Sequence, residues 1–277
     1  MGDTEVVVKS KPDHVFRCVT KILTIMLFLR LEEMSLLSID DIIEAGSGRN
    51  VTWKHVFSNT ATISNEFEYS NDKWVYAQAF VEQLLGTTFE EAVSNLILVP
   101  MGLIGYFEKH TEYPPMVARG YRGSNEDLMV IGSTLASGGV SPKTALRVIS
   151  SNSVQKMLRD STKHAKDTFN NNKVVESMNR FLKDKSSSGN NVVSGYGLGL
   201  WRTKGWRTRL GKDVQGWLSM GSSEALLYFD EDVVVSMCAE QRILGLELTV
   251  SLKDVVQEIG SRLNDAYNTL DSSNSVE

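Results

Sequence analysis

Apolar residues recur so densely between residues 18 and 34 that almost no polar face is left. They are Val19, Ile22, Leu23, Met26, Leu27, Leu29 and Leu31. A helix that is apolar nearly all round is buried on most of its sides. The pattern therefore predicts a buried helix over residues 18–34, preceded by a short strand at residues 4–9.

The middle of the chain alternates apolar helical stretches with polar turns. Its predicted helices cover residues 51–57, 72–85, 88–98, 128–137 and 151–157. Thr52 is a favourable N-cap, and Gly86 suits a left-handed helix end because it has no Cβ. Residues 160–194 are rich in Asn, Ser and Lys, with one apolar helical stretch at 174–182, which is typical of a variable insertion.

The C-terminal part changes to a strand pattern. Strands are predicted at residues 196–201, 225–229 and 233–240, the last two joined by a turn at residues 230–232. A final helix is predicted over residues 252–270, where Ser251 and Asp254 resemble a capping box. Helices around an antiparallel sheet describe an α+β fold.

The domain organisation follows from this order of elements. We expect one domain over residues 1–277, in which an antiparallel sheet is flanked by helices and a mostly helical subdomain is inserted. Residues 1–35 and 192–277 form the α/β part. Residues 36–191 form the helical part, with the polar insertion at 160–194.

Composition narrows the function classes. The chain has 277 residues, 42% hydrophobic and 23% charged, with a net charge of −5, which fits a globular protein and argues against nucleic acid as a partner. Two distant cysteines form no disulfide framework, and no apolar run is long enough for a signal peptide or a membrane span. We therefore expect a soluble, cytoplasmic protein without membrane attachment, unless an N-terminal segment is missing. The histidines lack metal-ligand spacing, so neither metal nor cofactor is expected.

Several segments, in consistent order, resemble the superfamily of serine β-lactamases, penicillin-binding proteins and related class C-type esterases. Cys18-Val19-Thr20-Lys21 is similar to the family's Ser-x-x-Lys motif, and Tyr69-Ser70-Asn71 to its Tyr-x-Asn loop. Weaker similarities lie at residues 51–55, 89–103, 120–139 and 196–199. The resemblance covers most of residues 12–240.

This resemblance implies acyl transfer on an ester, amide or peptide-like small molecule. Cys18 stands where the family has its nucleophilic serine, Lys21 and Tyr69 take the positions of the general base pair, and Asn71 that of the substrate-orienting amide. The third motif falls at residues 219–222. There Ser219, Gly221 and Ser222 would contribute to substrate binding and the oxyanion hole, with a neutral hydroxyl in place of the family's Lys or His.

Alternatives remain for each of these residues. Cys18 is also compatible with a small buried residue, and Tyr69 and Asn71 with ordinary turn residues. The chain before Cys18 is too short for the two strands that the family places there, so these strands are expected to be missing. The alternative function is a catalytically inactive homologue that keeps the fold as a binding module. Cys238 is predicted to be a packed core thiol.

Overall fold

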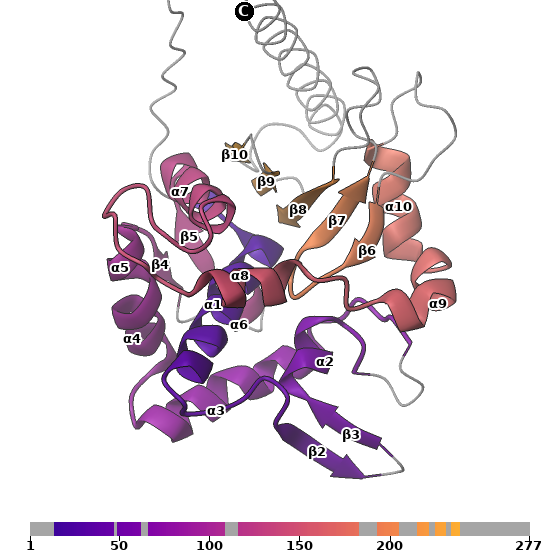
Figure 1. The fold of residues 1–277 in the computed structure, drawn as a ribbon, viewed down its shortest axis with the longest axis horizontal. Coiled ribbons are helices and arrows are strands. Elements are labelled where there is room, and N and C mark those ends of the chain that lie inside the picture. Colours follow the sequence, from indigo (N-terminus) through magenta and orange to yellow (C-terminus); the bar gives the residue numbers. More distant parts are fainter. Residues whose placement is uncertain are drawn as a thin grey trace, which may run out of the picture.

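The structure is a computed structural model that describes residues 14–46, 49–61, 66–108, 116–182, 193–204, 215–221, 225–230 and 234–238. Its largest described sheet is antiparallel, with the strand order β10-β9-β8-β7-β6 (Figure 1). The strands are β6 (Val193–Tyr196), β7 (Trp201–Lys204), β8 (Gln215–Gly221), β9 (Ala225–Phe229) and β10 (Val234–Cys238). Helices surround this sheet, which confirms the predicted α+β class. The strand predicted at 4–9 and the helix predicted at 252–270 lie outside the described residues.

The predicted N-terminal helix is confirmed. A 3-10 turn, η1 (Arg17–Val19), leads into α1 (Thr20–Glu33), which is buried continuously from Thr20 to Leu29. Two of its polar side chains bond to backbone, since Thr24 Oγ1 donates to the Val117 carbonyl at 2.5 Å and the Tyr121 N–H donates to Thr20 Oγ1 at 3.1 Å. These bonds allow polar residues inside a helix that has no solvent-facing side over most of its length.

The predicted helices of the middle region are present with small shifts of their ends. They are α2 (Trp53–Phe57), η2 (Asp72–Trp74) with α3 (Val75–Leu85), α4 (Phe89–Val93) with η3 (Ser94–Leu98), α7 (Asn125–Ala136) and α8 (Ser151–Leu158). Two short helices were not predicted, α5 (Val99–Met101) and α6 (Met116–Arg119). Gly86 ends α3 in the left-handed conformation, as predicted, with φ of 64°. α7 begins earlier than predicted because Ser124 caps it and forms a capping box with Asp127.

The sequence pattern missed short strands in the helical part. β2 (Ile42–Gly46) and β3 (Arg49–Thr52) form a hairpin that stands out from the helices (Figure 1). β1 (His14–Val15), β4 (Tyr106–Phe107) and β5 (Tyr121–Gly123) form a small sheet in the order β1-β5-β4. Strands of two or three residues are too short for an alternating pattern to be visible.

The strand predicted at residues 196–201 is wrong. β6 ends at Tyr196 and β7 begins at Trp201, so these residues contain the turn between two strands. Gly199 adopts a left-handed φ of 71°, and a Cβ there would lie 2.4 Å from Ile25 Cδ1 of α1. Its glycine is therefore needed for both the turn and the close approach of the sheet to α1.

The polar insertion folds into η4 (Lys163–Ala165), α9 (Lys166–Asn170) and α10 (Lys173–Leu182), which lie beside β6 (Figure 1). Phe169 and Val175 from these helices join a second apolar cluster with Phe67, Tyr196 and Trp201. The insertion therefore packs against the segment that leads to the Tyr-x-Asn loop.

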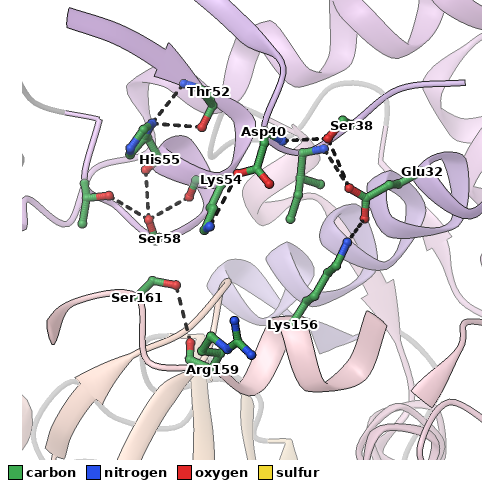
Figure 2. Close-up of polar contacts among 12 residues, drawn as sticks. Glu32, Ser38, Asp40, Thr52, Lys54, His55, Ser58, Lys156, Arg159 and Ser161 are labelled. Atoms are coloured by element: carbon green, nitrogen blue, oxygen red, sulfur yellow. Dashed lines mark hydrogen bonds and ion pairs between the residues drawn. The ribbon is translucent and has the colours of Figure 1, made fainter. Parts of the chain in front are cut away.

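Polar contacts fix the C-terminal end of α1 (Figure 2). Glu32 accepts a 2.6 Å ion pair from Lys156 of α8, and its other oxygen accepts the Ile39 N–H at 3.2 Å. In the segment that follows α1, the Asp40 carboxylate lies 3.5 Å from the Lys54 ammonium of α2. These contacts join α1, α2 and α8 at the end of α1 opposite Cys18.

Candidate active site

Cys18 and Lys21 are brought together by the turn that starts α1. Cys18 lies in η1 and Lys21 in the first turn of α1, three residues later, so their side chains share one helical face. Cys18 is partly exposed, whereas Lys21 is fully buried. A buried ammonium needs polar partners among the residues around it.

Tyr69 is the nearest polar partner of Lys21. Lys21 Nζ donates a hydrogen bond to the Tyr69 hydroxyl at 3.2 Å. The ammonium nitrogen also lies 4.9 Å from the centre of the Tyr69 ring and 5.4 Å from that of Trp74. The predicted pairing of Lys21 with Tyr69 is therefore present in the structure, although the two residues are 48 positions apart.

The loop that carries Tyr69 is held at several points. The Glu68 N–H donates to the Asn59 carbonyl at 2.9 Å, and the Ser70 N–H donates to the Asn59 side-chain oxygen at 3.2 Å. The Tyr69 ring stacks on Trp201 of β7 with the ring centres 5.2 Å apart. The backbone of this loop is therefore anchored on both sides of Tyr69.

Asn71 follows on the same loop and caps η2. It is largely buried, with 9% of its surface exposed, and its side-chain oxygen has no hydrogen-bond partner among the described residues. A buried amide oxygen without a partner is uncommon in folded proteins. This group is thus available to bind a donor such as a substrate N–H.

The electrostatic surroundings favour the thiolate form of Cys18. Burial acts to raise the pKa of the thiol, but the Lys21 charge, a hydrogen bond from Tyr69 and the Arg119 charge together outweigh it. The pKa of Cys18 therefore lies below that of an ordinary cysteine. The pKa of Cys238 is shifted in the other direction, because burial and the Asp127 charge raise it to about 12.

The pKa values of Lys21 and Tyr69 are shifted in opposite directions. Burial lowers the pKa of Lys21, which the neighbouring Cys18 partly opposes. Burial and the charge of Cys18 raise the pKa of Tyr69 well above its usual value. Tyr69 is consequently a neutral phenol at pH 7, which can accept a hydrogen bond from Lys21 while donating its own proton to Cys18.

The end of β8 lies against the residues just before Cys18. A Cβ on Gly221 would lie 2.1 Å from the Phe16 carbonyl oxygen, so only glycine fits there without a shift of the backbone. Ser219 is two residues earlier on the same face of the strand and is 2% exposed. Ser222 lies outside the described residues. The structure thus brings Ser219 and Gly221 to the η1 side of the sheet.

Several solved structures are similar to this fold. A β-lactamase from Mycobacterium bovis is 16% identical, with a TM-score of 0.60 over 94% of this chain and 88% of its own. A penicillin-binding protein from Bacillus halodurans is 14% identical, with a TM-score of 0.59 over 88% and 85%. A D-stereospecific amidohydrolase from a Streptomyces species is 17% identical, with a TM-score of 0.53 over 79% of each chain. The chain therefore has the fold of these β-lactamase and penicillin-binding-protein structures.

At the level of sequence the similarity is much weaker. No protein-family model and no curated protein matches the chain. The comparison therefore shows the fold and does not assign roles to Cys18, Lys21, Tyr69 and Asn71.

Three residues around the candidate site were missed from the sequence. Tyr196, at the end of β6, lies close enough to Cys18 for the thiolate to raise its pKa, and Asn59 hydrogen-bonds the Tyr69 loop. Arg119, at the end of α6, lowers the pKa of Cys18. Tyr196 belongs to the segment of weak family similarity at residues 196–199, but Asn59 and Arg119 carry no local signal.

Two further features of the described residues bear on function. No group of three or more His, Cys, Asp or Glu side chains among them is arranged to hold a metal ion. None of the described helices combines the length and apolar character needed to cross a bilayer.

Proposed function

We propose that the protein is an acyl-transfer hydrolase that acts on a small ester, amide or peptide-like substrate through Cys18. The contact between Lys21 and Tyr69 beside Cys18 carries this proposal, because it places a cation and a phenol next to a thiol of lowered pKa. The thiolate is the reactive form of cysteine, and a lowered pKa raises the fraction of Cys18 that is deprotonated before attack.

In the first half-reaction the Cys18 thiolate attacks the substrate carbonyl carbon. A carbon–sulfur bond forms, and the carbonyl electron pair moves to oxygen to give a tetrahedral oxyanion. The oxyanion then collapses, the bond to the leaving oxygen or nitrogen breaks, and the leaving group takes a proton from the Tyr69 hydroxyl, which Lys21 replaces. The products of this step are a thioester on Cys18 and a free alcohol or amine.

In the second half-reaction water attacks the thioester carbonyl. The Lys21 amine, relayed through Tyr69, accepts the proton from this water, so a hydroxide equivalent adds to the carbon. Collapse of the second tetrahedral intermediate releases a carboxylic acid and restores the Cys18 thiolate beside the Lys21 ammonium. The lowered pKa of Lys21 suits this exchange, because a buried lysine releases its proton more readily than an exposed one.

Binding groups for such a substrate are present around Cys18. The Asn71 side-chain oxygen is available to accept a substrate N–H. The backbone N–H of Cys18, at the start of a helix, and the backbone near Gly221 are the proposed donors to the oxyanion. These donors belong to η1 and β8, which lie in contact because Gly221 packs closely on Phe16.

A second function, a non-catalytic binding module, is favoured by one observation. β8 contains no charged residue between Gln215 and Gly221, and Ser219 is buried there, so the third motif supplies no cation. A fold of this kind hosts many functions, and the site alone distinguishes them.

A burst assay separates these two functions. Purified wild type, Cys18→Ala and Cys18→Ser are mixed with p-nitrophenyl acetate and, separately, with nitrocefin. We expect the wild type to release chromophore in a burst of about one equivalent per protein, as accumulating acyl-enzymes do. Cys18→Ala should give no burst, and Cys18→Ser a slower one because a hydroxyl is much harder to deprotonate. Absence of a burst in the wild type, with its fold verified by circular dichroism, would support the binding module.

A further inference from the structure

Asn59 follows α2 closely and has a backbone conformation that few residue types tolerate. Its φ is 56°, in the left-handed region, which asparagine enters more readily than most other residues with a side chain. Its N–H donates to the Val56 carbonyl at 3.2 Å, and the next N–H, that of Thr60, donates to the His55 carbonyl at 2.9 Å. The residue is buried, with 4% of its surface exposed. Asn59 is therefore held in one place at the end of α2.

The residues just before Asn59 tie this end of α2 to the rest of the fold. The Ser58 hydroxyl donates to the Lys54 carbonyl at 2.7 Å (Figure 2). The Phe57 carbonyl accepts the N–H of Gly199, in the turn between β6 and β7, at 3.0 Å. Because these bonds join α2 to a distant turn, Asn59 is a rigid support for any segment that binds to it.

The segment that binds to Asn59 is the Tyr-x-Asn loop. The Asn59 backbone carbonyl accepts the Glu68 N–H at 2.9 Å, and its side-chain oxygen accepts the Ser70 N–H at 3.2 Å. These two donors directly precede and follow Tyr69. The hydroxyl of Tyr69 in turn accepts a hydrogen bond from Lys21 Nζ at 3.2 Å. One residue thus fixes the backbone on both sides of the phenol that contacts Lys21.

We propose that Asn59 is a positioning residue of the Cys18 site: it holds the backbone of Tyr69 so that the phenol hydroxyl stays within hydrogen-bond distance of Lys21. This inference rests on the proposed acyl-transfer function, which gives the proton relay to Lys21 and Tyr69. Asn59 itself transfers no proton. It acts through the loop, from a position outside the Cys18–Lys21 and Tyr69–Asn71 motifs.

Other contacts of the loop constrain Tyr69 less directly. The Phe67 N–H donates to Thr168 Oγ1 at 3.0 Å, two residues before Tyr69. The Asp72 N–H donates to the Ser70 hydroxyl at 3.1 Å, a bond within the loop that moves with it. Stacking on Trp201 fixes the plane of the Tyr69 ring more strictly than the position of the ring within that plane. The bonds to Asn59 therefore set where the hydroxyl lies.

The test uses Asn59→Gly in the full-length protein. Glycine adopts the left-handed conformation freely and keeps the carbonyl that binds Glu68, so the substitution removes only the side-chain bond to Ser70. Ala145→Gly is the matched control, because Ala145 is an exposed residue with a φ of 60° and no polar side-chain atom. Hydrogen exchange of the Ser70 amide is followed by NMR. The pH profile of Cys18 alkylation by iodoacetamide is read by peptide mapping.

We expect the Ser70 amide to be protected in the wild type and to exchange on the order of tenfold faster in Asn59→Gly, because its acceptor is gone. The midpoint of Cys18 alkylation should rise by about half a pH unit, roughly a threefold loss of thiolate, since a displaced Tyr69 hydroxyl stabilises the sulfur less well. Ala145→Gly should change neither quantity. An unprotected Ser70 amide in the wild type overturns the proposal without any variant.

A double-mutant cycle with Tyr69→Phe shows whether Asn59 acts through the phenol. Tyr69→Phe alone should raise the alkylation midpoint, and adding Asn59→Gly should raise it no further, because the hydroxyl that Asn59 positions is already absent. No rise in Asn59→Gly, or an equal rise in both backgrounds, overturns the proposal.

Neither readout needs an acyl substrate, so the two proposals fail separately. The expected shifts together with no burst in the wild type would refute acyl transfer and support the hold of Asn59 on Tyr69. A burst in the wild type together with an unshifted Asn59→Gly would refute the role of Asn59 alone.

Discussion

Replacing Lys21 by Met is expected to slow alkylation of Cys18 at pH 7 by up to about ten- to a thousandfold, since an adjacent opposite charge shifts a pKa by roughly 1–3 units. Removing the cation raises the pKa of the thiol, so the fraction of Cys18 present as thiolate at neutral pH falls and labelling moves to higher pH. The free energy of unfolding should stay equal or rise. Lys21 is fully buried, and a methionine fills its space without the cost of desolvating a charge.

The measurement is competitive labelling with iodoacetamide, quantified separately at Cys18 and Cys238. Cys238 serves as the internal reference, because its pKa of about 12 keeps it unreactive in every variant. Lys54→Met is the matched control, since Lys54 is an exposed lysine that pairs with Asp40 far from the thiol. If Cys18 of Lys21→Met is alkylated as fast as Cys18 of the wild type, Lys21 does not activate the thiol.

Gly221→Ala is expected to destabilise the protein by about 3 kcal/mol, at the upper end of what overpacking a core costs. The added Cβ would lie 2.1 Å from the Phe16 carbonyl oxygen and 3.2 Å from Arg17 Cβ. The backbone of Phe16 cannot move aside as a flexible side chain can, so β8 and η1 must separate. Because Cys18 lies in η1, its fast alkylation should be lost together with stability.

Chemical denaturation combined with the same alkylation assay tests this expectation. Gly86→Ala is the matched control, because Gly86 has a φ of +64° with no atom near its missing Cβ, far from η1. It should cost about 1–2 kcal/mol from backbone strain alone, with Cys18 labelling unchanged. If Gly221→Ala is as stable as the wild type, the close contact between β8 and η1 is not a feature of the folded protein.

The helices could be predicted from the sequence because their apolar pattern and caps are local. Thr88 caps α4 through a bond from the Glu91 N–H, and Gly86 ends α3, as their positions indicate. The turn at residues 197–200 could not be predicted, because alternating glycines resemble the pleat of a strand. What makes it a turn is a left-handed Gly199 that also gives room to α1, a contact between distant segments.

In the candidate site, too, contacts between residues near in sequence could be predicted from spacing and contacts between distant residues could not. Helical spacing places Lys21 on the face of Cys18, but nothing in the sequence spacing brings Tyr69 to Lys21; only the family resemblance predicted that pair. Arg119 escaped notice because a lone arginine is ordinary on a protein surface. Its place in the fold depends on backbone bonds of the neighbouring residues Val117 and Tyr121, which join distant segments of the chain.

The central claim, that Cys18 is an activated nucleophile, is tested most directly by locating the acyl group. Wild-type protein is mixed briefly with p-nitrophenyl acetate, quenched in acid, digested and analysed by mass spectrometry. The account predicts one acetyl group, carried by the peptide that contains Cys18 and located on its sulfur, with Cys238 unmodified. Acetylation confined to surface lysines, or an unmodified Cys18 in folded protein, would contradict it.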